Sequence, residues 1–192
     1  MTPRETALGH LDLDALTDAQ ADVSFRMDED AFRGFYDRTS RQLWSYLNRL
    51  TGDRNAADDL LQEAYYRFLR ADAPLESEAH RRHYLFRIAT NLAADRQRRL
   101  RTQPPPASAE VDTFADGPPA AALNQRIDVQ SALARLGVRD RAMLWLAYAQ
   151  GATHDEIARV VGLKTGSIKP LLLRARRRMA ALLEATSTRR AR

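Results

Sequence analysis

The sequence predicts an all-α fold in which two small helical domains are joined by a flexible, proline-rich linker. Three observations lead to this prediction. Apolar residues recur at three- and four-residue spacings on both sides of residues 102–122, a pattern typical of helices with one buried face. Residues 102–122 themselves carry five prolines, including three in a row, and proline cannot continue a helix. No segment shows the alternation of apolar and polar residues that is typical of a half-buried strand.

The composition excludes several classes of protein. The chain has 192 residues, 44% of them hydrophobic, which suits one or two domains with their own cores. It contains no cysteine, so disulfide scaffolds, cysteine zinc sites and thiol catalysis are excluded. No apolar run approaches the roughly 20 residues of a membrane helix, and the first residues show no secretory signal. We therefore expect a cytoplasmic protein without a membrane span.

The positive charge is concentrated in two blocks. The net charge is +5, and 28 of the 30 basic residues are arginine. Residues 76–101 carry a net charge of +4 and residues 123–192 carry +9, whereas residues 102–122 carry −3. A genome rich in arginine codons would spread arginine evenly along the chain. Two basic blocks on separate modules instead favour a protein that binds a polyanion, because neutralised phosphates release counterions.

The first domain is predicted over residues 28–101, after an acidic extension at residues 1–27 that is either disordered or a partner-binding arm. Its first helix starts at Asp28 or Asp30, either of which fits an N-cap. Gly52 ends this helix, and a second helix follows as far as residue 70. A loop over residues 71–79 then leads to a third helix that runs from about residue 78 to residue 101.

The second domain is predicted over residues 123–186, with a basic tail at 187–192, and contains a helix-turn-helix. Thr153 is placed to cap the first helix of this motif, and Glu156 is placed to complete a capping box. Gly162 marks the tight turn. Apolar residues spaced along the second helix predict its buried face, which leaves Leu171 and several polar residues facing outward. A basic helix pair that only packs on a core is the alternative interpretation.

Three segments, taken together with the linker, resemble the extracytoplasmic-function (ECF) sigma factors of the sigma-70 family. The segments are AADDLLQEAYYRFLR at residues 56–70, HYLFRIATNLAADRQRR at residues 83–99, and the stretch from ALARLG to RARRRM at residues 132–179. The resemblance covers roughly residues 28–185. It implies a dissociable, non-catalytic subunit of bacterial RNA polymerase that has no cofactor and no metal.

The resemblance also implies partners and site residues. The partners are the largest subunits of core RNA polymerase, double-stranded and melted promoter DNA, and an anti-sigma factor. The core-polymerase-binding residues are Asp58, Asp59, Gln62 and Glu63. The residues expected to melt and hold the proximal (−10) element are Tyr84, Phe86, Arg87, Asn91, Arg96, Arg98 and Arg99. Those expected to contact the distal (−35) element are Thr165, Ser167, Lys169, Arg174, Arg177 and Arg178.

Two segments depart from the family pattern. One is the second helix of the helix-turn-helix, called the recognition helix, and the other is residues 83–99, called the melting segment. Tyr84 stands where the family usually has tryptophan, and it either stacks on DNA or packs in the core. Pro170 stands where serine is common, and it is expected to kink the helix or shift its start. Leu171 and Leu173 stand where arginine and histidine are frequent. These changes remove polar groups from the expected DNA-facing side.

Two other functions compete with promoter recognition. A stand-alone helix-turn-helix regulator with an N-terminal sensor domain explains residues 123–192 equally well. It leaves unexplained the polar stripe that Asp58, Asp59, Gln62 and Glu63 form along the second helix, called the acidic stripe below. A metal-dependent phosphohydrolase would use Asp58, Asp59 and Glu63 together with His80 or His83. Adjacent aspartates point about 100° apart on a helix, which disfavours joint ligation, and the chain has no nucleophile constellation to support this chemistry.

Overall fold

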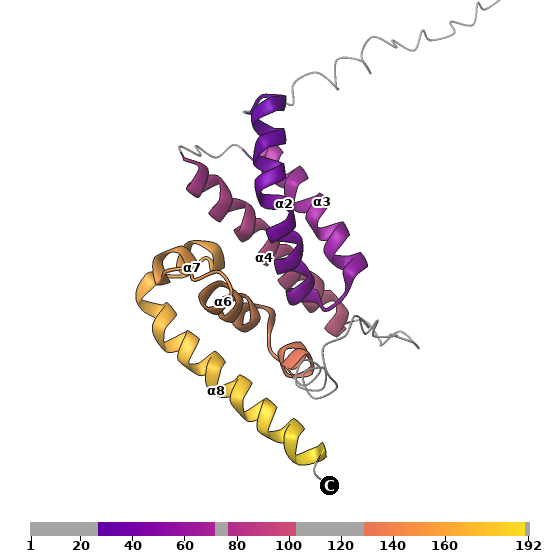
Figure 1. Cartoon of the computed structure of the whole chain (residues 1–192), viewed down its shortest axis with the longest axis vertical. Helices are drawn as coiled ribbons and strands as arrows, with labels where there is room; N and C mark the ends of the chain where they lie inside the picture. The colour runs from indigo at the N-terminus through magenta and orange to yellow at the C-terminus, as the bar shows by residue number, and fades with distance from the viewer. Residues whose placement is uncertain (1–26, 72–76, 103–128, 191–192) are drawn as a thin grey trace, which may run out of the picture.

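The computed structural model describes residues 27–71, 77–102 and 129–190, and every regular element within these ranges is a helix (Figure 1). The elements are α2 (Glu29–Thr51), α3 (Arg54–Arg70), α4 (Glu78–Thr102), α6 (Val138–Tyr148), α7 (His154–Val161) and α8 (Thr165–Arg190), and residues 129–135 are also helical. The all-α prediction is therefore confirmed for this part of the chain. Most of the acidic extension, the centre of the 71–79 loop and all but the first residue of the predicted linker lie outside the described residues.

Side-chain caps and left-handed residues set the helix ends. The backbone N–H of Ala31 donates to Asp28 at 2.7 Å, which makes Asp28 the N-cap of α2. At the other end, Gly52 has φ +72°, a conformation that glycine adopts without strain. Asp53 then caps α3 by accepting from Ala56 at 3.1 Å. Both predicted boundaries of α2 thus follow from local chemistry.

The turn between α7 and α8 also forms as predicted. Thr153 and Glu156 make a reciprocal capping box, in which the backbone N–H of each residue donates to the side chain of the other. Gly162 ends α7 with φ +69°. After this turn α8 runs without interruption past Pro170 to Arg190, so residues 187–190 extend the helix instead of forming a separate tail.

Helices α2, α3 and α4 pack around an aromatic core. The rings of Phe35 and Phe68 stack with their centroids 5.1 Å apart. The Tyr46 and Phe86 rings are also 5.1 Å apart, and both residues are buried. The three helices form the upper part of the molecule in Figure 1, with α4 facing the C-terminal helices.

The C-terminal helices dock directly on this bundle. Helices α6 and α7 both contact α4, and α6 also contacts α2 (Figure 1). A single buried cluster includes Phe86 and Leu92 of the first module and Leu146 and Val160 of the second. The first backbone N–H of α6, at Val138, donates to the side chain of Gln97 on α4 at 3.1 Å. The two modules that the sequence predicts as separate domains therefore share one core in this structure.

Candidate protein and nucleic-acid interfaces

The acidic stripe of α3 lies on the outer side of the helix, where part of it is already engaged. Asp58 accepts a 2.6 Å hydrogen bond from the indole of Trp44. Glu63 pairs with Arg67 at 2.6 Å. Asp59 and Gln62 are exposed, and neither has a polar partner among the residues that the structure describes. The unengaged acceptors of the stripe are thus its middle members.

Trp44 was not among the predicted site residues, although it fixes the geometry of the stripe. Its ring lies under the guanidinium of Arg54, 5.7 Å from the ring centroid, while its N–H holds Asp58. In the sequence Trp44 matches the apolar periodicity of α2 and so indicates only packing. Its role depends on the approach of α2 to α3, which periodicity within one helix does not reveal.

The outer edge of α4 carries the exposed members of the predicted melting segment. Arg87, Asn91 and Arg98 are exposed and follow one another at four- and seven-residue spacings, so they share one edge of the helix. Tyr84 is half-buried, and its ring lies 6.4 Å from that of Phe68. The prediction for Phe86 is wrong, because its side chain is only 2% exposed and packs in the core, out of reach of a DNA base.

The arginines of α4 divide into paired and unpaired groups. Arg96 donates to Asp53 at 3.1 Å, which ties it to the α2–α3 turn. Arg98 pairs with Asp95 on its own helix. Arg87 and Arg99 are exposed, and within the described ranges neither has an acidic partner. Of the four predicted arginines, Arg87 and Arg99 are thus the most available to phosphates.

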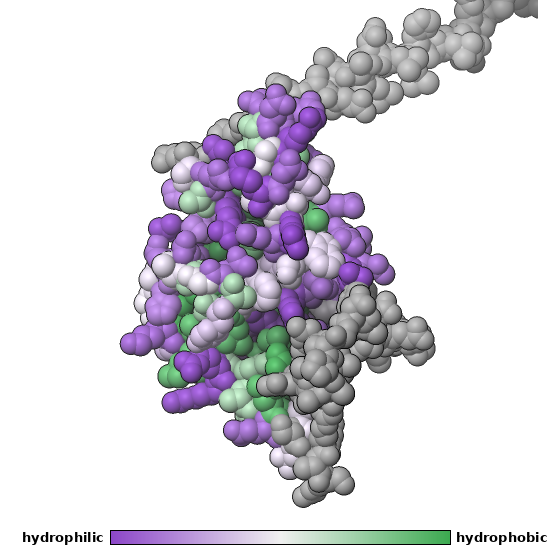
Figure 2. Space-filling model, viewed as in Figure 1, coloured by the Kyte–Doolittle hydropathy of each residue, from purple (hydrophilic) through white to green (hydrophobic). Residues whose placement is uncertain are grey.

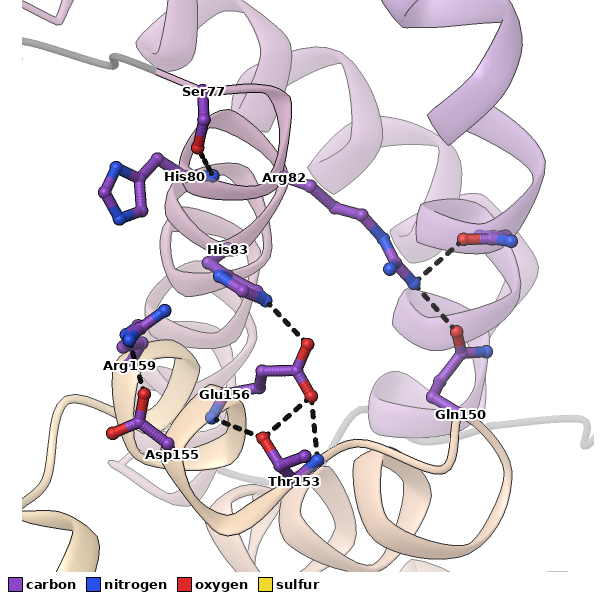
Figure 3. Close-up of polar contacts among 10 residues, drawn as sticks. Ser77, His80, Arg82, His83, Gln150, Thr153, Asp155, Glu156 and Arg159 are labelled. Carbon is purple, nitrogen blue, oxygen red and sulfur yellow. Dashed lines mark hydrogen bonds and ion pairs between the residues drawn. The ribbon is translucent and has the colours of Figure 1, made fainter.

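Polar contacts join α4 to the second module, as Figure 3 shows. The Nε2 atom of His83 lies 3.5 Å from Oε1 of Glu156, the same carboxylate that completes the α7 capping box. One nitrogen of Arg82 donates to Gln42 on α2 at 3.1 Å and to Gln150 beyond α6 at 3.0 Å. The structure thus places His83 at a contact between modules.

Burial and neighbouring groups shift the pKa values of this pair. Desolvation lowers the pKa of His83 below its ordinary value, and the carboxylate of Glu156 opposes this shift. Hydrogen bonds from Thr153 lower the pKa of Glu156. The Nδ1 atom of His83 is buried, and no described residue forms a hydrogen bond with it. The environment of His83 therefore favours the neutral imidazole.

The exposed face of α8 differs from the predicted one at Leu171. That side chain is half-buried and packs against the core, so its predicted outward position is wrong. Leu173 is exposed instead, with 45% of its surface accessible. Lys169, Arg174 and Arg177 are exposed as predicted, and Ser167 is half-exposed.

Two other predicted contacts of α8 are engaged within the second module. Thr165 donates to Asp155 at 2.9 Å, and Arg178 donates to Asp140 at 2.6 Å. Across the described ranges, no three His, Asp or Glu side chains gather closely enough to hold a metal ion. No helix among the residues described is both long enough and apolar enough to cross a membrane.

Comparison with known families assigns both modules. The family model described as Sigma-70 region 2 matches residues 35–103, and the model described as Sigma-70, region 4 matches residues 126–179. The chain is 33% identical over 156 residues to the ECF RNA polymerase sigma factor SigM of Mycobacterium tuberculosis, covering 81% of this chain and 79% of that protein. It is 29% identical over 156 residues to SigL of the same species, covering 79% and 88%.

Solved structures share the fold. The sigma factor RpoE of Bartonella quintana, solved in complex with the anti-sigma factor NepR, superimposes with a TM-score of 0.59 and 20% identity, covering 80% of this chain and 96% of that chain. The PhyRSL–NepR complex of Sphingomonas sp. Fr1 gives a TM-score of 0.56 and 18% identity, covering 79% and 88%.

Proposed function

Because the chain belongs to the ECF sigma factors of the sigma-70 family, we propose that α3 docks it on core RNA polymerase while α4 and α8 contact the promoter. The protein is an RNA polymerase sigma factor, which binds core polymerase and directs promoter recognition and melting. The observation that carries this conclusion is the presence of region 2 and region 4 in one chain, in this order. A stand-alone regulator accounts only for the second of these.

Docking on core polymerase is assigned to the acidic stripe of α3. Asp59 and Gln62 are free to accept hydrogen bonds from basic groups of the polymerase clamp. Asp58 contributes charge while Trp44 holds its orientation, and Glu63 exchanges Arg67 for a partner on the polymerase. Complementary charge across such a surface steers the encounter and fixes the register more than it adds affinity.

Promoter melting is assigned to the outer edge of α4. The side-chain amide of Asn91 can form two hydrogen bonds with the edge of an extruded base. Arg87 and Arg99 hold phosphates on either side of it, since neither guanidinium is committed to a described carboxylate. Tyr84 positions this edge through its contact with Phe68. Arg96 and Arg98 exchange their intramolecular partners for phosphates when DNA is bound.

Recognition of the distal element is assigned to α8. Lys169, Arg174 and Arg177 lie on its exposed side and supply contacts to bases and phosphates. Thr165 and Ser167 lie in the first turn, where a helix N-terminus favours a phosphate. Arg178 contributes only after it leaves Asp140.

The domain boundaries follow from this assignment. We place the core-binding and melting domain at residues 28–101, the linker at 102–122 and the distal-element domain at 123–186. The protein acts without catalytic chemistry of its own, in the cytoplasm with the polymerase. An anti-sigma factor is proposed as a further partner, supported by the fold shared with RpoE, which was solved with NepR.

Co-elution with core polymerase tests the docking surface. Asp59→Lys reverses a charge that has no intramolecular partner in the described structure, so the helix should keep its fold while polymerase binding falls at least tenfold. Asp37→Lys, which makes the same reversal at an exposed site on α2, is the matched control and should bind normally. Equal binding by both variants would refute the assignment of α3.

A further inference from the structure

The centre of the exposed face of α8 is apolar. Gly166, Pro170, Leu173 and Arg177 follow one another at spacings of four, three and four residues, so they form a line along one side of the helix. All four are exposed, and they lie opposite the line formed by the buried Ile168, Leu172 and Ala175. This line is therefore the part of α8 that reaches farthest from the core of the second module.

Intramolecular packing does not account for Leu173. Its neighbours Leu171 and Leu172 both contact the hydrophobic cluster, whereas Leu173 keeps 45% of its surface exposed. In the view shared by Figures 1 and 2, the hydrophobic surface gathers over the C-terminal module, along which α8 runs. An apolar side chain thus stands at the centre of a face whose edges are cationic, with Lys169 on one side and Arg174 on the other.

The chemistry of this line restricts what it can recognise. Glycine has no side chain, and proline and leucine carry no side-chain donor or acceptor. Two hydroxyls lie in the first turn of the helix: that of Thr165 is bonded to Asp155, and Ser167 is half-exposed beside Pro170. Hydrogen bonds to base edges therefore fall to Lys169, Arg174 and Arg177, which surround Pro170 and Leu173. Pro170 and Leu173 themselves can discriminate bases only by apolar contact.

Only one base of unmodified DNA offers such a contact in the major groove. Thymine presents a C5-methyl group there, whereas cytosine presents a hydrogen at the same position and a donor beside it. We propose that Leu173, with Pro170 beside it, recognises a thymine methyl group in the distal promoter element. This inference rests on the proposed function of α8 and names the base that its centre selects.

The test removes the methyl group and the leucine separately and then together. The full chain is combined with core polymerase, and a promoter is recovered by run-off transcription from genomic fragments. Each thymine of the distal element is then replaced by uracil, which lacks only the methyl group. At one position this should weaken holoenzyme binding about fourfold, as expected for the loss of one buried methyl group.

Leu173→Ala should weaken binding to the thymine duplex by a similar factor and abolish the difference between thymine and uracil at that position. Replacing that thymine with 5-methylcytosine should preserve more affinity in the wild-type chain than cytosine does, because the methyl group is restored. Leu100→Ala removes a leucine of similar exposure, 51%, from the end of α4 and should leave the thymine–uracil difference intact.

Two outcomes overturn this inference while leaving the proposed function in place. One is specific binding that no thymine-to-uracil replacement weakens. The other is a thymine–uracil difference that persists in Leu173→Ala, which would assign the methyl contact to another residue. If the holoenzyme recovers no promoter at all, it is the proposed function that fails. Circular dichroism of Leu173→Ala checks that α8 is intact.

Discussion

At the scale of single residues, two threonines supply hydrogen-bond partners for the hydroxyl groups of buried tyrosines. Thr90 donates its hydroxyl to the carbonyl of Phe86 at 2.7 Å, so its oxygen accepts from Tyr46 of the neighbouring helix, also at 2.7 Å. Thr39 and Tyr65 repeat this arrangement between α2 and α3. Burial raises the pKa of Tyr65 to about 12, so its hydroxyl stays protonated well above neutral pH. These pairs fix the register of α2 against both of its neighbours.

Tyr46→Phe removes one of these interhelical hydrogen bonds while keeping the ring. The buried Thr90 oxygen then loses its donor, so the free energy of unfolding should fall by about 1 kcal/mol. Tyr148→Phe makes the same change on a side chain that is 62% exposed and should leave stability unaltered. Urea denaturation of both variants checks this, and equal stability of Tyr46→Phe and the wild type would argue against the pairing.

We expect His83 to make the packing of the modules sensitive to acid. Because burial lowers its pKa below the ordinary value of 6.5, the unfolded chain binds a proton more readily than the folded chain. The stability contributed by neutral His83 is therefore present above about pH 6.5 and is lost as the pH falls through the folded-state pKa. The charges that face this imidazole are Glu156, which favours protonation, and Arg82 and Arg159, which oppose it.

Unfolding free energies measured between pH 7 and pH 5 test this effect. The wild type should lose stability over this range, and His83→Gln should lose less because it has no imidazole to protonate. His80→Gln, at an exposed histidine on the same helix, should follow the wild type. Parallel pH profiles for all three chains would show that His83 does not titrate at this contact.

At the scale of elements, Pro170 has one effect on the stability of α8 and a separate effect on its proposed contact with DNA. The helix continues from Thr165 through Pro170, where the sequence predicts a kink or a shifted start. Proline has no N–H, so the carbonyl of Gly166 goes without the usual helical hydrogen bond. Pro170 lies exposed on the line of α8 that we propose faces DNA.

Pro170→Ala should therefore stabilise the second module, by up to about 3 kcal/mol, since it restores a hydrogen bond in the helix interior. The same variant, like Pro170→Ser, should change the affinity or sequence preference for the distal element. Thermal unfolding and duplex binding measure the two effects. Lys169→Ala is the control for stability, with a change within about 0.5 kcal/mol. Lower stability in Pro170→Ala would contradict this account of the helix.

Much of the element structure could be predicted from local chemistry. Asp28, Thr153, Glu156 and Gly162 set helix ends through contacts within a few residues of the chain. The sequence identifies the last three and narrows the first to Asp28 or Asp30. Leu171 was misplaced because it borders the buried line of α8, where the packing of neighbouring helices decides which side chain is covered. The burial of Phe86 likewise depends on the approach of α2, α6 and α7 to α4.

At the scale of the whole molecule, the packing of the two modules is the feature that sequence patterns did not predict. The cap that Gln97 provides for α6 and the pairing of His83 with Glu156 join segments on either side of the predicted linker. Local periodicity carries no information about such contacts. In this arrangement the side chain of Arg87 lies beside Gly162, at the turn of the helix-turn-helix.

We expect that the packed arrangement cannot reach both proposed promoter elements at once. Elements about 25 base pairs apart are separated by roughly 85 Å of duplex at 3.4 Å per base pair. The residues between α4 and residue 129 can extend to about 90 Å, which is enough for the modules to occupy both elements after they separate. Promoter binding should therefore require the contacts between α4 and α7 to open.

Cross-linking tests whether opening is required. The chain has no cysteine, so His83→Cys with Glu156→Cys provides the only two thiols. Joining them with a short bis-maleimide should reduce run-off transcription at least tenfold. The same double variant without the cross-linker should transcribe at a level close to that of the wild type. Full activity of the cross-linked chain would show that the modules need not separate.

Run-off transcription with purified core polymerase and genomic fragments is the most direct test of the central claim, that this chain is a promoter-directing subunit. The account predicts discrete transcripts that appear only when the chain is added, that share upstream sequence elements, and that fall sharply with Asp59→Lys. The absence of any chain-dependent transcript, together with specific duplex binding by the chain alone, would contradict the account and favour a stand-alone regulator.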